Sequence, residues 1–370
     1  MIRLLLVALL MSLGMNLYLF VELQQSQQQA LPLMPQPPSE QSANDPPLPA
    51  TASPVSQNSF EAPHPLTQTS LQALLDNGQY RELENRLQHA LRQSPDNIDL
   101  LLLEGQLMVR TRPLSEAVLH LYALRDLPLS MSQRQALRQR IDELVSTAVE
   151  QLRTAEDWDL LAQLLEPLFQ IMPAHRPYIL QLAEAYARQN KPTLMEDVLA
   201  SLRPGDPQAN RIRALIPTPF EDPADTTEET AFTEPGTDNA GGITIQLEPD
   251  GSHFIANVSF ARESARLMLD TGATTTAITS ELYDNLQARQ RLVFIGNFEV
   301  NTAAGRVSAA MVQVPTVTFG PLRFTDLPVL VLPEGVMRDA DGLLGMNMMQ
   351  NMDFRLNQQT GELTLYRHGL

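Results

Sequence analysis

The hydrophobic pattern changes its period along the chain. Between about Ser70 and Leu215, apolar residues recur every three or four positions, and β-branched runs are scarce. This spacing gathers apolar side chains on one face of a helix, so it predicts an all-α region over residues 68–215. After Gly242 the period becomes two, which is typical of short strands and predicts an all-β domain over residues 242–370.

The helical region contains an internal repeat. The segment YRELENRLQHALRQSP (80–95) aligns with WDLLAQLLEPLFQIMP (158–173), aromatic on aromatic and proline on proline, and further along Pro113 aligns with Pro192. Each copy is expected to hold a helix, a proline turn, a second helix, a short break and a third helix. The pattern resembles degenerate tetratricopeptide-like repeats, which stack helix pairs into a solenoid, and an irregular helical bundle is the alternative. Either arrangement indicates a role in protein contact or spacing.

The strand-rich end carries frequent turn signals, namely PDGS, AAGR, FGPL and QQTGE. The expected strands are ITIQL, FIANVSF, ARLML, LVFIGNFEV, VSAAMVQV, VTF, LPVLVL and ELTLY, and only TSELYDNLQAR and NMMQNM are expected to be helical. Because the strands are short and numerous, we expect a small closed β-barrel or a sandwich.

Residues 1–23 are predicted to anchor the chain in a membrane. Arg3 precedes an apolar run from Leu4 to Val21, which just reaches across a bilayer core of about 30 Å. A cleaved signal peptide is the alternative, but the apolar run continues past its expected end, and no Ala-x-Ala site follows. Because the positive charge precedes the run, we expect a single-pass protein of the inner (cytoplasmic) membrane with most of its chain in the periplasm.

Two segments lack periodicity. Residues 24–67 are rich in Pro, Gln and Ser, whereas residues 216–241 are acidic and contain Pro and Gly. Such compositions bury too little apolar surface to offset the entropy lost on ordering. We therefore expect a disordered, partly polyproline spacer and an acidic linker that serves as a hinge.

Composition removes several classes of function. The formal net charge of −17 would repel a nucleic-acid backbone, so no nucleic-acid partner is expected. The chain has no cysteine, and its single lysine, Lys191, does not follow a glycine, so thiolate sites and phosphate-binding GxxxxGK loops are excluded. The histidines are scattered and form no HExxH motif, and no cofactor or metal site is expected.

The stretch RLMLDTGATTT (266–276) ends an apolar strand on an acid, Asp270. The local interpretation is an Asx turn, in which the carboxylate accepts the backbone N–H of Gly272 and the glycine supplies an unusual φ/ψ. An isolated D-T-G tripeptide is weak evidence for more than that, since it also occurs by chance.

Further features accompany the tripeptide. Apolar residues precede Asp270 and the small Ala273 follows the glycine, while DGLLGMN places an apolar-apolar-Gly segment before a short helix. Between them, VNTAAGRVSA predicts a hairpin with a glycine at its tip. In this order, and over about Ile243 to Leu365, these features resemble the retropepsin-like aspartic proteases.

The resemblance implies a role for each motif. Asp270 would be the catalytic acid, in a loop completed by Thr271, Gly272 and Ala273. Thr271 would bond to its counterpart in a partner loop, and Gly272 would let the backbone approach that loop and the substrate. A supporting segment would pack beneath the loop, and a flap would close over the peptide. The supporting residues are Leu343, Leu344 and Gly345, and the flap residues are Thr302, Ala303, Ala304 and Gly305. An ordinary hairpin turn is the alternative for the flap.

The acid loop occurs once in the sequence, whereas hydrolysis by this route needs two carboxyls that share a proton. The resemblance therefore implies a homodimer in which each chain supplies Asp270 at a two-fold axis. Thr274 and Met346 stand where viral members of the family carry an acid and an arginine, so that ion pair is missing and the dimer is expected to be weaker or differently built. In this respect the chain looks more like the bacterial membrane-anchored branch.

The sequence thus favours a membrane-anchored aspartic endopeptidase that acts on protein or peptide substrates, with helical repeats that recruit or space a protein partner. The alternative is a non-catalytic retropepsin-like module that dimerises or binds peptide on a helical scaffold.

Overall fold

The computed structural model describes residues 68–216, 242–302, 305–337, 339–350 and 352–367, which lie in one compact unit, Pro63–Leu370. The predicted membrane segment (1–23), the spacer (24–67) and nearly all of the acidic linker (216–241) lie outside the described residues. Within the described part of the chain, no helix has both the length and the apolar character required to cross a membrane.

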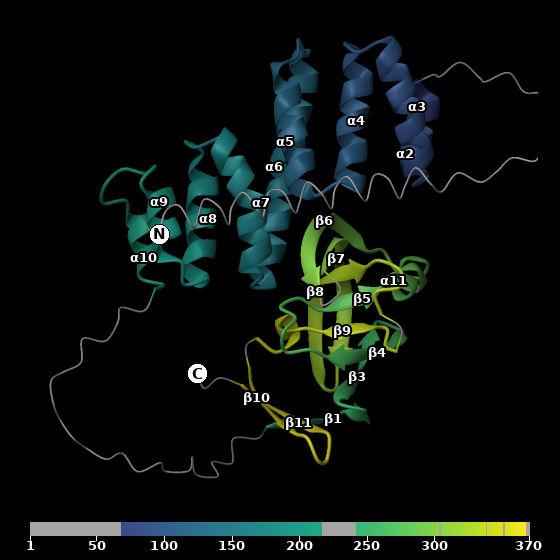
Figure 1. Ribbon diagram of the computed structural model, residues 1–370, viewed down its shortest axis with the longest axis vertical. Helices are drawn as coiled ribbons and strands as arrows, with labels where there is room; N and C mark the ends of the chain where they lie inside the picture. Colours follow the sequence, from purple (N-terminus) through teal and green to yellow (C-terminus); the bar gives the residue numbers. More distant parts are fainter. Residues whose placement is uncertain (1–67, 217–241, 303–304, 338, 351, 368–370) are drawn as a thin grey trace, which may run out of the picture. The chain divides into compact units, whose positions relative to one another are not determined.

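The first described region is helical, as predicted (Figure 1). Its helices are α2 (Gln68–Asp76), α3 (Tyr80–Gln93), α4 (Ile98–Thr111), α5 (Leu114–Ala123), α6 (Met131–Thr154), α7 (Trp158–Ile171), α8 (Arg176–Arg188), α9 (Pro192–Leu199) and α10 (Pro207–Arg213), with a 3-10 turn at Leu124–Asp126. Helices adjacent in the sequence pack together, including α3 on α4, α7 on α8 and α8 on α9. The tetratricopeptide-like assignment stays a prediction.

Local sequence sets where these helices begin. Four of the helices are capped by a side-chain oxygen that accepts backbone N–H groups of the first turn. The capping residues are Asn97, Ser130, Asp157 and Asp206. The aligned segments of the repeat both begin a helix at their aromatic residue, as α3 and α7 do. Small residues occur in the core of the helical region, among them Ala117, Ala148 and Ala183. A Cβ at Gly105 of α4 would lie 2.7 Å from Leu121 of α5, so this glycine permits the close approach of the two helices.

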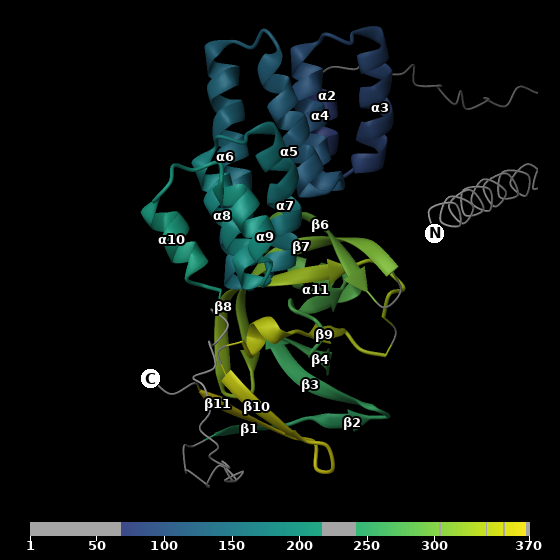
Figure 2. The same cartoon turned by 60° about the vertical axis from the view of Figure 1, so that its left-hand side comes forward.

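The second region is the predicted β domain. Its strands are β1 (Ile243–Gln246), β2 (Glu248–Asp250), β3 (His253–Phe260), β4 (Glu263–Leu269), β5 (Ala277–Thr279), β6 (Val293–Thr302), β7 (Gly305–Phe319), β8 (Leu322–Leu332), β9 (Gly342–Leu344), β10 (Met352–Asn357) and β11 (Glu362–Arg367). One sheet has the order β2-β3-β4-β9-β5-β8-β7-β6, with a further pairing of β3 with β7, and the other has the order β1-β11-β10. Figure 2 shows β9 beside β4 in the larger sheet.

The helical expectations within the β domain are met only in part. The predicted helix at TSELYDNLQAR forms α11 (Ser280–Gln287). NMMQNM was expected to be helical, but only a 3-10 turn forms at Met346–Met348, because the following residues lead into β10. Two predicted strands on either side of Pro315 are one strand, β7, in which the pairing with β8 skips Pro315 and Asp326.

The larger sheet has an apolar core on each face. Ile278 and Val329 belong to the core inside the β domain, whereas their neighbours Ala277 and Leu330 belong to a core shared with the helical region. Adjacent residues of a strand point to opposite faces, so this alternation buries β5 and β8 on both sides. The helical region therefore packs against the sheet that carries the acid loop.

Candidate functional site

Asp270 is the first residue after β4, and β9 fixes its position. Leu267, Met268 and Leu269 pair in parallel with the three residues of β9, and the backbone N–H of Asp270 donates to the carbonyl oxygen of Leu344 at 3.1 Å. The end of β4 and the end of β9 are thereby held side by side. The strand pairing, rather than any charged neighbour, places the carboxyl.

The acid loop, defined as residues 270–276, begins with a turn built on that carboxyl. Asp270 Oδ1 accepts the backbone N–H of Gly272 at 2.9 Å, which is the expected Asx turn. The expectation of a strained glycine is wrong: Gly272 is absent from the residues with positive φ, and its role is steric, since a Cβ there would lie 3.2 Å from Oδ1. Thr271, Gly272 and Thr274 are exposed, while Asp270 and Ala273 are partly exposed.

The predicted supporting segment packs directly against the acid loop. Leu344 is buried in the core of the β domain, and Leu343 is partly buried on the face shared with the helices. A Cβ at Gly345 would lie 2.5 Å from the carbonyl carbon of Thr275, and one at Gly342 would lie 2.0 Å from the carbonyl oxygen of Ala277. Both glycines let the β9 backbone contact the acid-loop strand, and Gly342 is a requirement that the sequence did not reveal.

A buried polar network ties the two segments together. Thr276 donates both its backbone N–H and its hydroxyl to Asn347 Oδ1, at 2.9 and 2.7 Å, and its hydroxyl oxygen accepts the backbone N–H of Gly345 at 3.1 Å. Asn347 Nδ2 donates to the carbonyl oxygen of Pro328 at 3.0 Å. Buried groups satisfied in this way rigidify their surroundings. Sequence reasoning passed over Asn347, although it stands two residues after the Leu-Leu-Gly segment.

The predicted flap is the hairpin of β6 and β7. Thr302 pairs with Gly305, and the Thr302 hydroxyl donates to the Gly305 carbonyl oxygen at 2.8 Å. Gly305 has φ of +113° with no atom within 4 Å of an added Cβ, so it is required for backbone conformation and not for space. Ala303 and Ala304 lie outside the described residues.

Asp341 has a structural role beside the acid loop. Its Oδ2 accepts the backbone N–H of Arg266 at 2.8 Å, and its own N–H donates to the carbonyl oxygen of Arg266 at 2.8 Å. These contacts bracket the start of β9 against β4. Asp341 therefore fixes the strand beneath the acid loop.

A second acid reaches the loop from the helical region. Thr275 donates its hydroxyl to Asp157 Oδ2 at 2.8 Å, and Asp157 also caps α7 by accepting the N–H of Leu160. Asp157 is 7% exposed, and this burial raises the pKa of its carboxyl, with a smaller contribution from the nearby Asp159; the bonds from Thr275 and Leu160 oppose the shift. Nothing in the sequence around Asp157 distinguished it from an ordinary helix cap.

This arrangement lies within a segment that matches a known protein family. Residues 256–351 match the family described as "gag-polyprotein putative aspartyl protease", and the matched segment includes the acid loop, the hairpin and the Leu-Leu-Gly segment. The predicted resemblance of the C-terminal domain to retropepsin-like aspartic proteases is thus confirmed, while the bacterial membrane-anchored branch stays a prediction.

Solved structures similar to the chain include a retropepsin-like aspartic protease from Rickettsia conorii. The two are 25% identical, and the match covers 34% of this chain and 90% of that one with a TM-score of 0.25. Another is the retroviral protease-like domain of Ddi1 from Leishmania major, at 9% identity, 32% and 97% coverage and a TM-score of 0.21. The comparison with curated proteins finds no match.

Proposed function

We propose that the C-terminal domain is an aspartic endopeptidase whose active site forms when two chains bring their copies of Asp270 together. The observation that carries the proposal is the placement of Asp270 at the end of β4, braced by β9 and followed by an exposed loop tip. Exposed Thr271 and Gly272 leave room for a second loop of the same kind. The family match over residues 256–351 supports a peptidase of this class.

The chemistry requires the two carboxyls to hold one proton between them. The unprotonated Asp270 takes a proton from a water molecule as the water oxygen attacks the peptide carbonyl carbon. The protonated Asp270 of the partner subunit gives its proton to the carbonyl oxygen, which yields a diol. The diol then returns one hydroxyl proton to the unprotonated acid, the other acid protonates the nitrogen, and the C–N bond breaks. The pair ends with one proton, as it began.

Mutation of Asp270 tests the activity. Asp270→Asn in the full-length protein is expected to abolish cleavage of a peptide library between mildly acidic and neutral pH, with the circular dichroism spectrum unchanged. Asp326→Asn is the matched control, because Asp326 is an exposed acid at a left-handed position of β8, which asparagine tolerates. Equal turnover by wild type and Asp270→Asn would refute the proposal, and binding of peptide without cleavage by wild type would favour a non-catalytic module.

A mixing experiment tests the shared site. If each active site needs Asp270 from both chains, equal amounts of wild-type and Asp270→Asn subunits, exchanged to equilibrium, should retain about a quarter of the wild-type activity. Independent active sites in each chain would instead retain about half. The activity is measured at a total concentration at which sedimentation shows dimers.

We further propose that the apolar N-terminal run anchors the chain with its bulk in the periplasm and that the helical region contacts a protein partner. The charge order at Arg3 and the long apolar run after it support the anchor. Protease digestion of spheroplasts should remove the region after residue 24, and protection of that region would contradict the orientation.

A further inference from the structure

The turn between α6 and α7 is the point at which the helical region meets the acid loop. Asp157 in this turn accepts the hydroxyl of Thr275, and Gln350, which follows the Leu-Leu-Gly segment, donates to the carbonyl oxygen of Thr154 at 3.0 Å. A second turn, between α4 and α5, holds the base of the hairpin: Asn297 donates to the carbonyl oxygens of Arg110 and Arg112 at 3.1 and 3.3 Å. These contacts and the shared apolar core make the helical region a fixed neighbour of the site.

The helices leave the centre of the site open. Thr271 and Thr274 in the acid loop are exposed, and so are Asn301 and Gly305 near the hairpin tip. Thr275, by contrast, is buried against the helices. A polypeptide that passes Asp270 and leaves the site on this side therefore meets the α6–α7 turn.

A groove begins at that turn and follows one face of α8. Its first hollow, of about 500 Å³, is lined by residues that include Thr154, Glu156, Trp158 and Arg188. Its second, of about 600 Å³, is lined by residues that include Pro177, Leu180, Arg211, Ile212 and Leu215. Arg153, Gln181 and Glu184 line both hollows, so the two are continuous.

The length of the groove suits an extended peptide segment. One face of α8 lines the groove, because its lining residues recur every three or four positions, at Pro177, Gln181, Glu184 and Arg188. The groove therefore runs from the end of α8, beside Trp158, to the start of α8, beside α10. Gln189 fixes the first end by donating to the carbonyl oxygen of Trp158 at 2.6 Å. The 13 residues of α8 span about 20 Å at 1.5 Å each, which an extended chain covers with about six residues.

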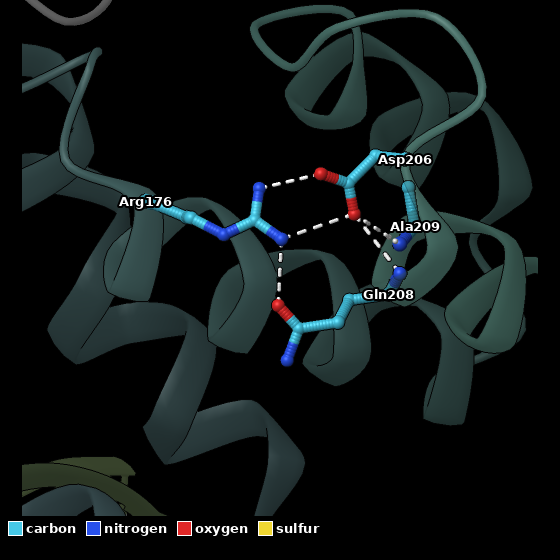
Figure 3. Close-up of polar contacts among 4 residues, drawn as sticks. All are labelled: Arg176, Asp206, Gln208 and Ala209. Atoms are coloured by element: carbon cyan, nitrogen blue, oxygen red, sulfur yellow. Dashed lines mark hydrogen bonds and ion pairs between the residues drawn. The ribbon is translucent and has the colours of Figure 1, made fainter.

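The far end of the groove is held by one ion pair and the hydrogen bonds around it. Arg176 at the start of α8 donates to both carboxylate oxygens of Asp206, at 2.5 and 3.1 Å, and to Gln208 Oε1 at 2.6 Å (Figure 3). Asp206 also caps α10, so this bidentate contact fixes α10 against α8. The wall that carries Arg211 and Leu215 is thereby preorganised.

The groove has an apolar floor and, among the described residues, two arginines without a paired carboxylate: Arg188, whose guanidinium lies over the Trp158 ring, and Arg211. Arg176 is paired with Asp206 and Arg153 with Glu184, whereas no carboxylate of the described residues lies within ion-pair distance of Arg211. Leu180 and Ile212 are partly or fully buried beside it, and Leu215 is 37% exposed. In a chain with a net charge of −17, an unpaired arginine beside exposed apolar surface favours an acidic and apolar ligand.

We propose that this groove binds the part of a substrate polypeptide that lies several residues from the cleaved bond, and that it selects a segment with apolar side chains and a carboxylate that pairs with Arg211. The occupant is substrate because the groove is continuous with the turn that contacts the acid loop. The inference rests on the proposed peptidase function and adds a selectivity that the β domain alone does not supply.

The test compares short and extended peptides on the full-length protein. A short peptide cleaved by wild type is extended, at its N-terminal or its C-terminal end, by about eight residues that contain Leu and Glu. One of the two extensions should raise kcat/KM about fivefold, through KM. Arg211→Glu should remove this gain, and replacing Glu by Lys in the extension should restore it in that variant. Arg203→Glu is the matched control, because Arg203 is also exposed and lies in the loop before α10.

Binding separates this proposal from the peptidase proposal. Fluorescence anisotropy with the uncleaving Asp270→Asn chain should show tighter binding of the extended peptide, weakened by Arg211→Glu and not by Arg203→Glu. That result supports the groove even if no peptide is cleaved by wild type. Equal affinity for short and extended peptides, or equal effects of the two arginine variants, would overturn it.

Discussion

At the scale of single residues, the Asx turn of Asp270 is compatible with the catalytic role proposed for that residue. Its Oδ1 closes an Asx turn onto Gly272, while no described residue bonds its Oδ2. The turn fixes the orientation of the carboxyl and leaves one oxygen for a second carboxyl or a water molecule. The local explanation of the D-T-G motif and the catalytic one are therefore compatible, because the turn is the means of aiming the acid.

The most consequential polar residue near the acid loop is Asn347. Asn347→Ala would leave the buried N–H of Thr276 without its partner and would remove the hydrogen bond to the carbonyl oxygen of Pro328. We expect the free energy of unfolding to fall by about 2 to 4 kcal/mol, because an unsatisfied buried group costs about 1 to 3 kcal/mol and a lost hydrogen bond about 1 kcal/mol. Urea denaturation followed by circular dichroism measures the change.

Asn301→Ala is the control for that measurement, because Asn301 is exposed near the hairpin tip. Its effect should stay within about 0.5 kcal/mol of wild type. Comparable stability of the two variants would show that the network around Thr276 contributes little.

At the scale of elements, β9 is the strand on which the site depends. It lies between β4, with which it pairs in parallel, and β5, with which it is antiparallel. A glycine stands at its first position and another immediately after it, and both contact the backbone on the acid-loop side. The three-residue strand β9 therefore sets the spacing between β4 and β5.

Substitutions at two glycines should distinguish the close packing at the end of β9 from the backbone conformation of an ordinary turn. Gly345→Ala puts a Cβ 2.5 Å from a backbone carbon, so it should lower the free energy of unfolding by about 3 kcal/mol or more. Gly305→Ala meets no atom within 4 Å and only strains a positive φ, which should cost about 1 to 2 kcal/mol. Thermal unfolding compares the two, and a larger loss at Gly305 would contradict the steric role given to Gly345.

The strands that sequence periodicity revealed are those that are long enough to alternate. The sequence predicted four such strands close to their observed bounds, namely β3, β4, β6 and β11. β5 and β9 have three residues each, too few to show a period, and they form because their neighbours in space supply the hydrogen bonds. β10 was missed because the apolar residues before it suggested a helix. Tertiary pairing, which local patterns do not encode, decides these cases.

The candidate site was predictable from the sequence only where its residues lie in contiguous motifs. Asp270, Gly272 and Gly345 stand out because the acid loop and the Leu-Leu-Gly segment are contiguous motifs, and the structure brings those motifs together. Thr276 and Asn347 carry no signal of their own, since their importance comes from a contact between segments far apart in the sequence.

At the scale of the whole molecule, the helical region and the β domain share one apolar core in the described part of the chain. Ile295 and Phe298 of β6 are buried in it, and Gly296 between them lies against Leu114, the first residue of α5. The sequence predicted two separate domains joined by an acidic linker. It could not reveal their contact, because each apolar face is equally consistent with an interface to a separate partner.

The contact between Asp157 and Thr275 should make the stability of this interface depend on pH. Burial raises the pKa of Asp157 above its ordinary value of 3.8, so the folded chain binds its proton more tightly than the unfolded chain does. The contribution of Asp157 to stability is fully present below about pH 4 and is lost as pH rises through the raised pKa. Asp157→Asn keeps a cap for α7 and carries no charge, so the variant should gain stability relative to wild type as pH rises from about 4 to 7.

Asp206 supplies a control of opposite sign. The Arg176 guanidinium holds the pKa of Asp206 at about 2, so the stability from this pair is present above the ordinary value of 3.8 and is lost as pH falls toward 2. Asp206→Asn should therefore be less stable than wild type at neutral pH, and the difference should shrink in acid. Urea denaturation of wild type and both variants at about pH 2.5, 4, 5.5 and 7 measures how the free energy of unfolding changes with pH in each case. The contrary outcome is that Asp157→Asn loses stability relative to wild type as pH rises. Asp157 would then be charged and stabilising at the interface. The α6–α7 turn would be held to the acid loop by an interaction other than the one described.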